Sequence, residues 1–286
     1  MEDKRKVTVK DILKMKGTEK ISVLTAYDYS MSQICDRAGV DVLLVGYSAG
    51  MVMLGYSSTV PVSMNEIMTF CNAVARGTKR AMIVGDMPFG SYQPNSSMAI
   101  KNAVKLIKAG CDAVKLEGGT EMMATIKAIV DAGIPVMGHI GLKPQTSSLW
   151  EGYKIQGKTK EAAIKLIQDA KSLDKAGVFS IVLEMVAAEV ADAITRSVSV
   201  PTIGIGSGIN CDGQVLVLHD MLGIYEDIKP KFVKRYAELN NLILDAVSNY
   251  TRDTKMGKFP EETNTFHMSQ DEILNLEEVL NEEKKQ

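Results

Sequence analysis

The sequence predicts an α/β protein whose fold is a (β/α)8 barrel. Apolar runs of four or five residues alternate with amphipathic segments of helical length across residues 18–250. Five of the predicted helices end at a glycine shortly before the next apolar run, which is the rhythm of a parallel sheet with helices outside it. A length of 286 residues is common for a single barrel of this kind. Seven clear strands and a weaker eighth favour the closed barrel, and a doubly wound open sheet is the alternative.

The predicted elements follow one another without a linker between residues 18 and 250. Thr8 can cap a short helix over residues 9–16, which Gly17 ends. The predicted strands are residues 21–25, 42–45, 81–84, 113–116, 134–137, 179–183, 202–205 and, with a weaker pattern, 215–218. The predicted helices are residues 29–38, 65–76, 97–109, 121–132, 160–176, 188–197 and a long final helix at 229–249. The whole chain, residues 1–286, is therefore expected to be one barrel domain with an N-terminal helix at 8–17 and a helical tail at 269–286.

The composition argues against several classes of function. A net charge of -2, with no basic stripe, gives no support for binding to nucleic acid or to an anionic membrane. The segment 42–64 has no charged residue, but its glycines and Pro61 break it into a strand and a loop, so no membrane span is expected. The charged N-terminus has no apolar stretch typical of a signal peptide. The cysteines form no CxxC pair and no metal-ligand spacing with histidine, so we expect inert thiols in a reducing cytoplasm: Cys35, Cys71, Cys111 and Cys211.

One predicted strand carries two charges on the same face. In the segment Asp112–Gly119, Lys115 and Glu117 are two residues apart, so they point to one side while Val114 and Leu116 point to the other. Burying a charge without a partner is expensive. A strand that presents a cation and a carboxylate together is therefore expected to build a site and not only a core.

Three other apolar runs also end in an ionisable residue. They end in Asp86, His139 and Glu184, while the charged strand ends in Glu117. All strand C-terminal ends lie on one side of a parallel barrel, where the active sites of such barrels are found. We therefore expect these four side chains to converge. Taken singly, Asp86 is also compatible with a helix cap or a surface ion pair, and His139 with a structural histidine.

The types of side chain in this set suggest a chemistry. Carboxylates without a cysteine or histidine cluster suit a hard cation such as Mg²⁺, which prefers oxygen ligands and keeps several waters. A further carboxylate away from the metal is free to act as a base. Such a set fits enolisation of an oxo acid, in which the metal stabilises the enolate while the base removes the adjacent proton.

Two other segments have open interpretations. Gly204–Gly208 follows a predicted strand, and it could cradle a ligand anion or simply form a tight turn that needs positive φ. The stretch Trp150–Tyr153 lies in a long loop, and long loops in compact domains often serve as lids over a substrate.

Seven stretches of the chain together resemble the ketopantoate hydroxymethyltransferase family over about residues 8–266. They are Met51–Pro61, Gly85–Tyr92, Val114–Gly119, Gly138–Gln145, Gly152–Gly157, Leu183–Met185 and Ile203–Gly223. The resemblance implies a barrel of the phosphoenolpyruvate mutase/isocitrate lyase superfamily, assembled as a homo-oligomer, usually a decamer. It also implies transfer of a hydroxymethyl group from 5,10-methylenetetrahydrofolate to 3-methyl-2-oxobutanoate, which gives 2-dehydropantoate for pantothenate synthesis in the cytoplasm.

The resemblance also implies roles for individual residues. Asp86 and Glu117 match metal ligands, which would hold Mg²⁺, and Glu184 matches the base that abstracts the proton. The residues expected around the substrate are Tyr47, Ser48, Asp86, Lys115 and His139.

Position 47 departs from the family pattern. The family usually reads Val-Gly-Asp-Ser where this chain has Val45-Gly46-Tyr47-Ser48, so a metal-ligating aspartate is replaced by a phenol. Ala49 and Lys143 also differ from the commoner family residues. Because a neutral phenol is a poor replacement for a carboxylate, we expect weak Mg²⁺ binding and low but measurable activity. The alternatives are another oxo-acid carbon–carbon lyase or mutase of the superfamily, and a catalytically impaired paralogue with a binding or assembly role.

Overall fold

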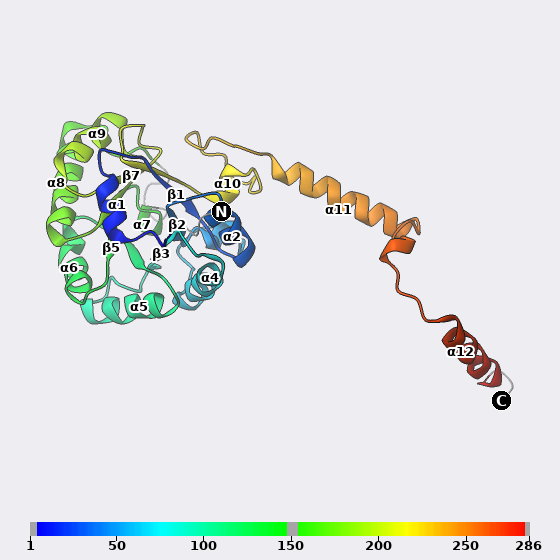
Figure 1. Cartoon of the computed structure of the whole chain (residues 1–286). Coiled ribbons are helices and arrows are strands. Elements are labelled where there is room, and N and C mark those ends of the chain that lie inside the picture. The colour runs from blue at the N-terminus through cyan, green and yellow to red at the C-terminus, as the bar shows by residue number, and fades with distance from the viewer. Residues whose placement is uncertain (1–4, 148–153, 284–286) are drawn as a thin grey trace. The chain divides into compact units, whose positions relative to one another are not determined.

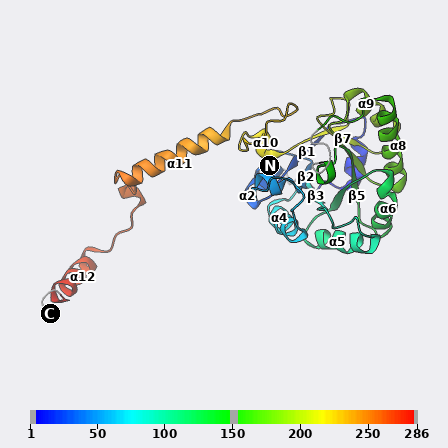
Figure 2. The same ribbon diagram turned by 180° about the vertical axis from the view of Figure 1, so that it is seen from behind.

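The computed structural model describes residues 5–147 and 154–283. The chain divides into two compact units, Met1–Ala237 and Glu238–Gln286. The first unit holds a barrel with helices arranged around its outside (Figures 1 and 2). The expectation that residues 1–286 form a single barrel domain stays a prediction.

Eight parallel strands close into a barrel in the order in which they occur along the chain. The strands are β1 (Ile21–Thr25), β2 (Val42–Val45), β3 (Met82–Asp86), β4 (Ala113–Glu117), β5 (Val136–Gly141), β6 (Ser180–Glu184), β7 (Thr202–Ile205) and β8 (Gly213–Leu216). Pairing of β1 with β8, with Val23 opposite Val215, completes the ring. The predicted (β/α)8 barrel is therefore confirmed, and the open sheet is excluded.

The helices of the first unit alternate with the strands as the sequence predicts. They are α1 (Val9–Met15), α2 (Tyr29–Arg37), α3 (Ala49–Val52), α4 (Met64–Gly77), α5 (Ser96–Lys108), η1 (Thr120–Met122), α6 (Met123–Asp131), α7 (Pro144–Ser147), α8 (Lys160–Ala176), α9 (Ala188–Ser197) and α10 (Leu218–Met221). Thr8 caps α1 in a capping box with Asp11, as expected. The second unit contains α11 (Leu239–Lys255), η2 (Glu262–Asn264) and α12 (Gln270–Glu283).

Several sequence-based boundaries were wrong. Two strands that were expected at 81–84 and 134–137 are β3 (Met82–Asp86) and β5 (Val136–Gly141). Strand β8 begins at Gly213, two residues before the expected start, because Gly213 packs where any Cβ would lie 2.5 Å from the carbonyl oxygen of Ile21. The last long helix, expected at 229–249, is α11 and begins only at Leu239. Residues 229–237 are not helical, and Phe232 in this stretch packs against the core inside the barrel instead. Tertiary packing thus overrides a helical pattern.

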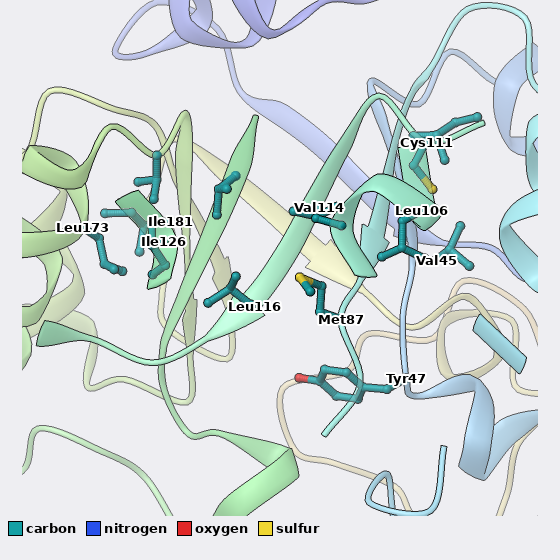
Figure 3. Close-up of a cluster of buried hydrophobic side chains, with 14 of the residues drawn as sticks. Val45, Tyr47, Met87, Leu106, Cys111, Val114, Leu116, Ile126, Leu173 and Ile181 are labelled. Carbon is teal, nitrogen blue, oxygen red and sulfur yellow. The ribbon is translucent and has the colours of Figure 1, made fainter. Parts of the chain in front are cut away.

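Strand β4 alternates between the two sides of the barrel wall, as its sequence predicts. Val114 and Leu116 belong to the apolar cluster between the strands and the helices, which also contains Leu106 and Ile126. Figure 3 shows part of this cluster, with Tyr47 at its edge. The neighbouring Ala113 belongs to a second apolar cluster, inside the barrel. The charged residues of β4 therefore have their side chains on the inner side, where the apolar residues of the other strands fill the barrel below them.

Two further expectations concern thiols and membranes. All four cysteines are buried and free, as expected. Within the residues that the structure describes, no helix is both long and apolar enough to cross a membrane.

Candidate active site

A cavity of about 870 Å³ opens where the strands of the barrel end. Asp86 and Glu184 line it, and they are the last residues of β3 and β6. The cavity brings together most of the residues that the sequence singles out: Tyr47, Ser48, Asp86, Lys115, His139 and Glu184. Glu117 also ends its strand at this side but does not line the cavity.

Lys115 and Asp86 form a buried ion pair at the base of the site. They are register partners on β4 and β3, and the lysine Nζ lies 2.8 Å from Asp86 Oδ1. Both side chains are almost completely buried. Burial raises the pKa of Asp86 to about 6, and the ammonium of Lys115 opposes that rise. The pair therefore keeps a cation facing the cavity inside a poorly solvated environment.

Tyr47 separates Glu117 from the cavity. Its hydroxyl donates a hydrogen bond to Glu117 Oε1, and Lys115 Nζ lies 4.7 Å from the centre of its ring. Burial raises the pKa of the Tyr47 phenol well above its ordinary value, and the nearby carboxylates, Glu117 first, raise it further. Tyr47 is therefore a neutral donor that neutralises no charge. It points into the site and not away from it.

His139 connects Lys115 to Glu184. Its Nδ1 lies 3.3 Å from Lys115 Nζ and its Nε2 lies 3.1 Å from Glu184 Oε2. Burial, with the positive charge of Lys115, lowers the pKa of His139 to about 3, so the ring is neutral. A lysine ammonium can only donate, so Nδ1 must accept, and the ring proton is then on Nε2, facing Glu184. This arrangement sets the tautomer of the histidine and places its Nε2 beside Glu184, although the pair does not have the geometry of a hydrogen bond.

Glu184 is the most exposed carboxylate of the group and also a perturbed one. Its side chain is 15% exposed, compared with 2% for Asp86 and for Glu117. Burial raises its pKa to about 7, opposed by Lys115. The next residue, Met185, has φ 49°, a left-handed conformation that is uncommon for a residue other than glycine. A carboxylate with a pKa near neutrality at the cavity surface is suited to accept and return a proton.

Ser48 meets a partner that the sequence did not single out. Its hydroxyl lies 2.8 Å from the hydroxyl of Tyr27, which is fully buried. Gly46 allows this approach, because a Cβ there would lie 3.1 Å from Ser48 Oγ and 3.6 Å from Asp86 Oδ2. Asp220 in α10 also lines the cavity and was missed. Both lie outside the apolar runs that end in a charge, so that pattern could not find them, although Asp220 falls in the stretch Ile203–Gly223.

The carboxylates of the site have only part of the arrangement that a hard cation requires. Among the residues that the structure describes, no group of three or more His, Cys, Asp or Glu side chains is arranged to hold a metal ion. Glu117 Oε2 is buried without a hydrogen-bond partner, and burial raises the pKa of this carboxyl group. A desolvated carboxylate oxygen with no donor is the kind of atom that a cation satisfies. The chemistry of this oxygen is therefore compatible with a cation, and the assignment of Asp86 and Glu117 as ligands of one cation stays a prediction.

The glycine-rich stretch after β7 is a turn. Gly206 has φ 65° and Gly208 has φ 87°, values that favour glycine. Between them, the hydroxyl of Ser207 donates to the carbonyl oxygen of Leu183 at 2.7 Å and accepts from the amide of Val186 at 3.0 Å. The tight-turn interpretation is therefore correct. The other open segment, Trp150–Tyr153, lies outside the described residues, and its role as a lid stays a prediction.

Comparisons with known proteins agree with this fold and extend it. The family model described as ketopantoate hydroxymethyltransferase matches residues 6–262. The 3-methyl-2-oxobutanoate hydroxymethyltransferase of Nitrosopumilus maritimus (strain SCM1) is 58% identical over 274 residues, which are 96% of this chain and 98% of the relative. Crystal structures of phosphonopyruvate hydrolase (TM-score 0.60, 11% identity, 97% of each chain) and of 2,3-dimethylmalate lyase (TM-score 0.54, 12% identity, 97% of this chain and 98% of the other) share the fold. The latter is a member of the PEP mutase/isocitrate lyase superfamily. The chain belongs to the ketopantoate hydroxymethyltransferase family and is a transferase of pantothenate biosynthesis.

Proposed function

We propose that the chain transfers a hydroxymethyl group from 5,10-methylenetetrahydrofolate to 3-methyl-2-oxobutanoate and so makes 2-dehydropantoate. The observation that carries the proposal is the pairing of a near-neutral carboxylate, Glu184, with a buried cation, Lys115, in one cavity. A base and a fixed positive charge are what removal of a proton next to a carbonyl group requires. The relative from Nitrosopumilus maritimus carries the name of this activity.

In this proposal each residue of the cavity has a separate role in the reaction. Lys115 attracts the carboxylate and oxo groups of the substrate, and Ser48 offers a hydroxyl beside them. Glu184 removes the proton at C3, and His139 holds the Glu184 carboxylate in place through Nε2. The methylene carbon of the folate is bonded to two nitrogens. One of these bonds breaks as the enolate carbon attacks the methylene carbon, and water then displaces the second nitrogen, so that the water oxygen becomes the hydroxyl group. The proton taken by Glu184 and one proton of the water pass to the two nitrogens, and tetrahydrofolate leaves.

Mg²⁺ is the metal that this proposal assigns to the site. Asp86 and Glu117 would hold it, and a bound Mg²⁺ would supply a positive charge that stabilises the enolate. Tyr47 provides no third carboxylate, so the affinity for Mg²⁺ is expected to be weak. The proposal also includes a cytoplasmic homo-oligomer, a decamer by family resemblance, that acts on a small oxo acid and a folate and has no nucleic-acid or membrane partner.

The experiment that tests the proposal is a direct assay with both substrates, with and without Mg²⁺. We expect 2-dehydropantoate to form at a low rate that increases when Mg²⁺ is added. Complete lack of product at saturating Mg²⁺, in a sample that binds both substrates, would instead support a catalytically impaired paralogue. Turnover of the oxo acid without folate would support a lyase or mutase.

A further inference from the structure

The cavity is larger than one small oxo acid needs. Its volume of about 870 Å³ is that of pockets that take drug-sized ligands, roughly 300–1,000 Å³. The residues proposed for the reaction occupy one part of its lining. A second part comes from the turn after β7, from α10 and from residues 225–232. This second part is the feature that the reaction residues do not explain.

The second part of the lining is apolar and partly open to solvent. Ile209 and Ile228 are 82% and 41% exposed, and both line the cavity. Phe232 lies against the turn after β7, since a Cβ on Gly206 would be 3.0 Å from its ring. Large apolar side chains gathered around a cavity mouth and left in contact with water are typical of a binding site for an apolar or aromatic group.

Two charged residues accompany this apolar surface. Asp220 in α10 is only partly exposed, and no hydrogen bond joins its carboxylate to another residue of the described part of the chain. Burial raises the pKa of Asp220 to about 6, opposed by Arg235. Lys231 is exposed and lines the same cavity. The second part therefore contains one carboxylate that only accepts hydrogen bonds, Asp220, and one exposed cation, Lys231.

Short contacts connect α10 to the residues proposed for the reaction. The amide of Leu218 donates to Thr25 Oγ1 at 3.0 Å, and the ring of His219 lies 5.6 Å from the ring of Tyr27. Tyr27 in turn is 2.8 Å from Ser48. A ligand bound along Asp220 would therefore extend from the cavity mouth toward Ser48 and Lys115.

We propose that this second part of the cavity is the subsite for the folate cosubstrate, with Asp220 accepting hydrogen bonds from its pterin ring. The inference rests on the proposed function, which requires a folate in the same cavity as the oxo acid. The aminopyrimidinone edge of a pterin presents two adjacent N–H donors, and a carboxylate accepts two parallel donors well. The ring packs on the isoleucines and on Phe232, and Lys231 faces the carboxylates of the glutamate tail.

The test measures the binding of tetrahydrofolate by calorimetry, without the oxo acid. Asp220→Asn should weaken binding on the order of 10- to 100-fold, since it replaces a charged acceptor by an amide that presents its own donors. Asp227→Asn is the matched control, because Asp227 is an exposed acid that does not line the cavity. Lys231→Gln should weaken binding by a smaller factor, with Lys234→Gln as its control.

A modified ligand makes the test independent of the folding of any variant. A tetrahydrofolate analogue whose 2-amino group is replaced by methyl should bind the unmodified protein on the order of tenfold more weakly. It should lose little further affinity in Asp220→Asn, because both changes remove the same contact. Equal affinity of the unmodified protein for both ligands, or equal binding by Asp220→Asn and Asp227→Asn, would overturn the inference.

The failure of this inference can be told apart from the failure of the proposed function. Exchange of the C3 proton of 3-methyl-2-oxobutanoate for deuterium needs no folate and reports on the part of the cavity that holds Glu184 and Lys115. A protein that exchanges this proton and binds tetrahydrofolate regardless of Asp220 contradicts only the subsite. A protein that neither exchanges this proton nor binds tetrahydrofolate contradicts both proposals.

Discussion

Replacing Tyr47 with aspartate should strengthen the binding of Mg²⁺. The Tyr47 hydroxyl donates to Glu117 Oε1 beside the proposed ligands, so an aspartate there adds a third negative charge close to the cation. Two unit charges 4 Å apart interact by about 4 kcal/mol at an effective dielectric constant of about 20. Desolvation of the new carboxylate and its repulsion by the two existing ones offset much of this gain. We expect a net gain of about 1.4–2.8 kcal/mol, which is about 10- to 100-fold in the dissociation constant.

The measurement is a calorimetric titration of Mg²⁺ into metal-stripped protein, together with the transferase rate at limiting Mg²⁺. Tyr47→Asn is the matched control, because asparagine has the size of aspartate without its charge. Tyr47→Asp should bind Mg²⁺ more tightly and react faster than both Tyr47→Asn and the unmodified protein. If all three proteins have the same affinity and the same rate, position 47 is not part of a metal site, and its alignment with the family aspartate has no functional meaning.

The remaining predictions concern the base and its support. Glu184→Gln should slow the exchange of the C3 proton of 3-methyl-2-oxobutanoate by about 10²–10⁴, as followed by NMR, with an unchanged circular dichroism spectrum. In the unmodified protein the exchange rate should increase as the pH rises through about 7 and then level off, because only the deprotonated Glu184 accepts a proton and burial raises its pKa to that value; a flat profile from pH 5 to 8 would contradict this. Gly141→Ala should lower the unfolding free energy by about 2 kcal/mol or more and slow the exchange, because its Cβ would clash with the carbonyl oxygen of Glu184 at a φ of 96°. Gly133→Ala, at a φ of 85° with nothing within 4 Å, should cost only about 1–2 kcal/mol and leave the exchange unchanged.

The fold could be predicted because each strand carries its own local signal. Apolar runs separated by glycine-ended helices determine both the number and the direction of the strands, and the alternation in β4 predicts which side chains face inward. The boundary errors have a tertiary origin. Phe232 packs against the core inside the barrel and Gly213 packs against β1, and neither contact is visible in a local pattern.

The candidate site could be predicted only in part. The strand-end rule brings Asp86, Glu184 and their neighbours to one end of the barrel, because parallel strands must end on the same side. It does not give the order of contacts within that group. Lys115 pairs with Asp86 on the neighbouring strand and not with Glu117, with which it shares a strand face. Asp220 contributes from a short helix after the last strand, where no periodic pattern distinguishes it from a surface residue.

The charges in and beside the cavity suggest what Tyr47 contributes to the protein. Asp86, Glu117 and Glu184 are carboxyl groups whose pKa is raised by burial, and Lys115 is the cation that faces them. Another carboxylate at position 47 would increase the electrostatic repulsion among these carboxylates whenever no metal is bound. A neutral phenol that donates to Glu117 lowers that repulsion and satisfies one of its buried oxygens. The same substitution that strengthens metal binding should therefore weaken the metal-free fold. Compared with an aspartate, Tyr47 is therefore expected to lower the affinity for Mg²⁺ and to raise the stability of the metal-free protein.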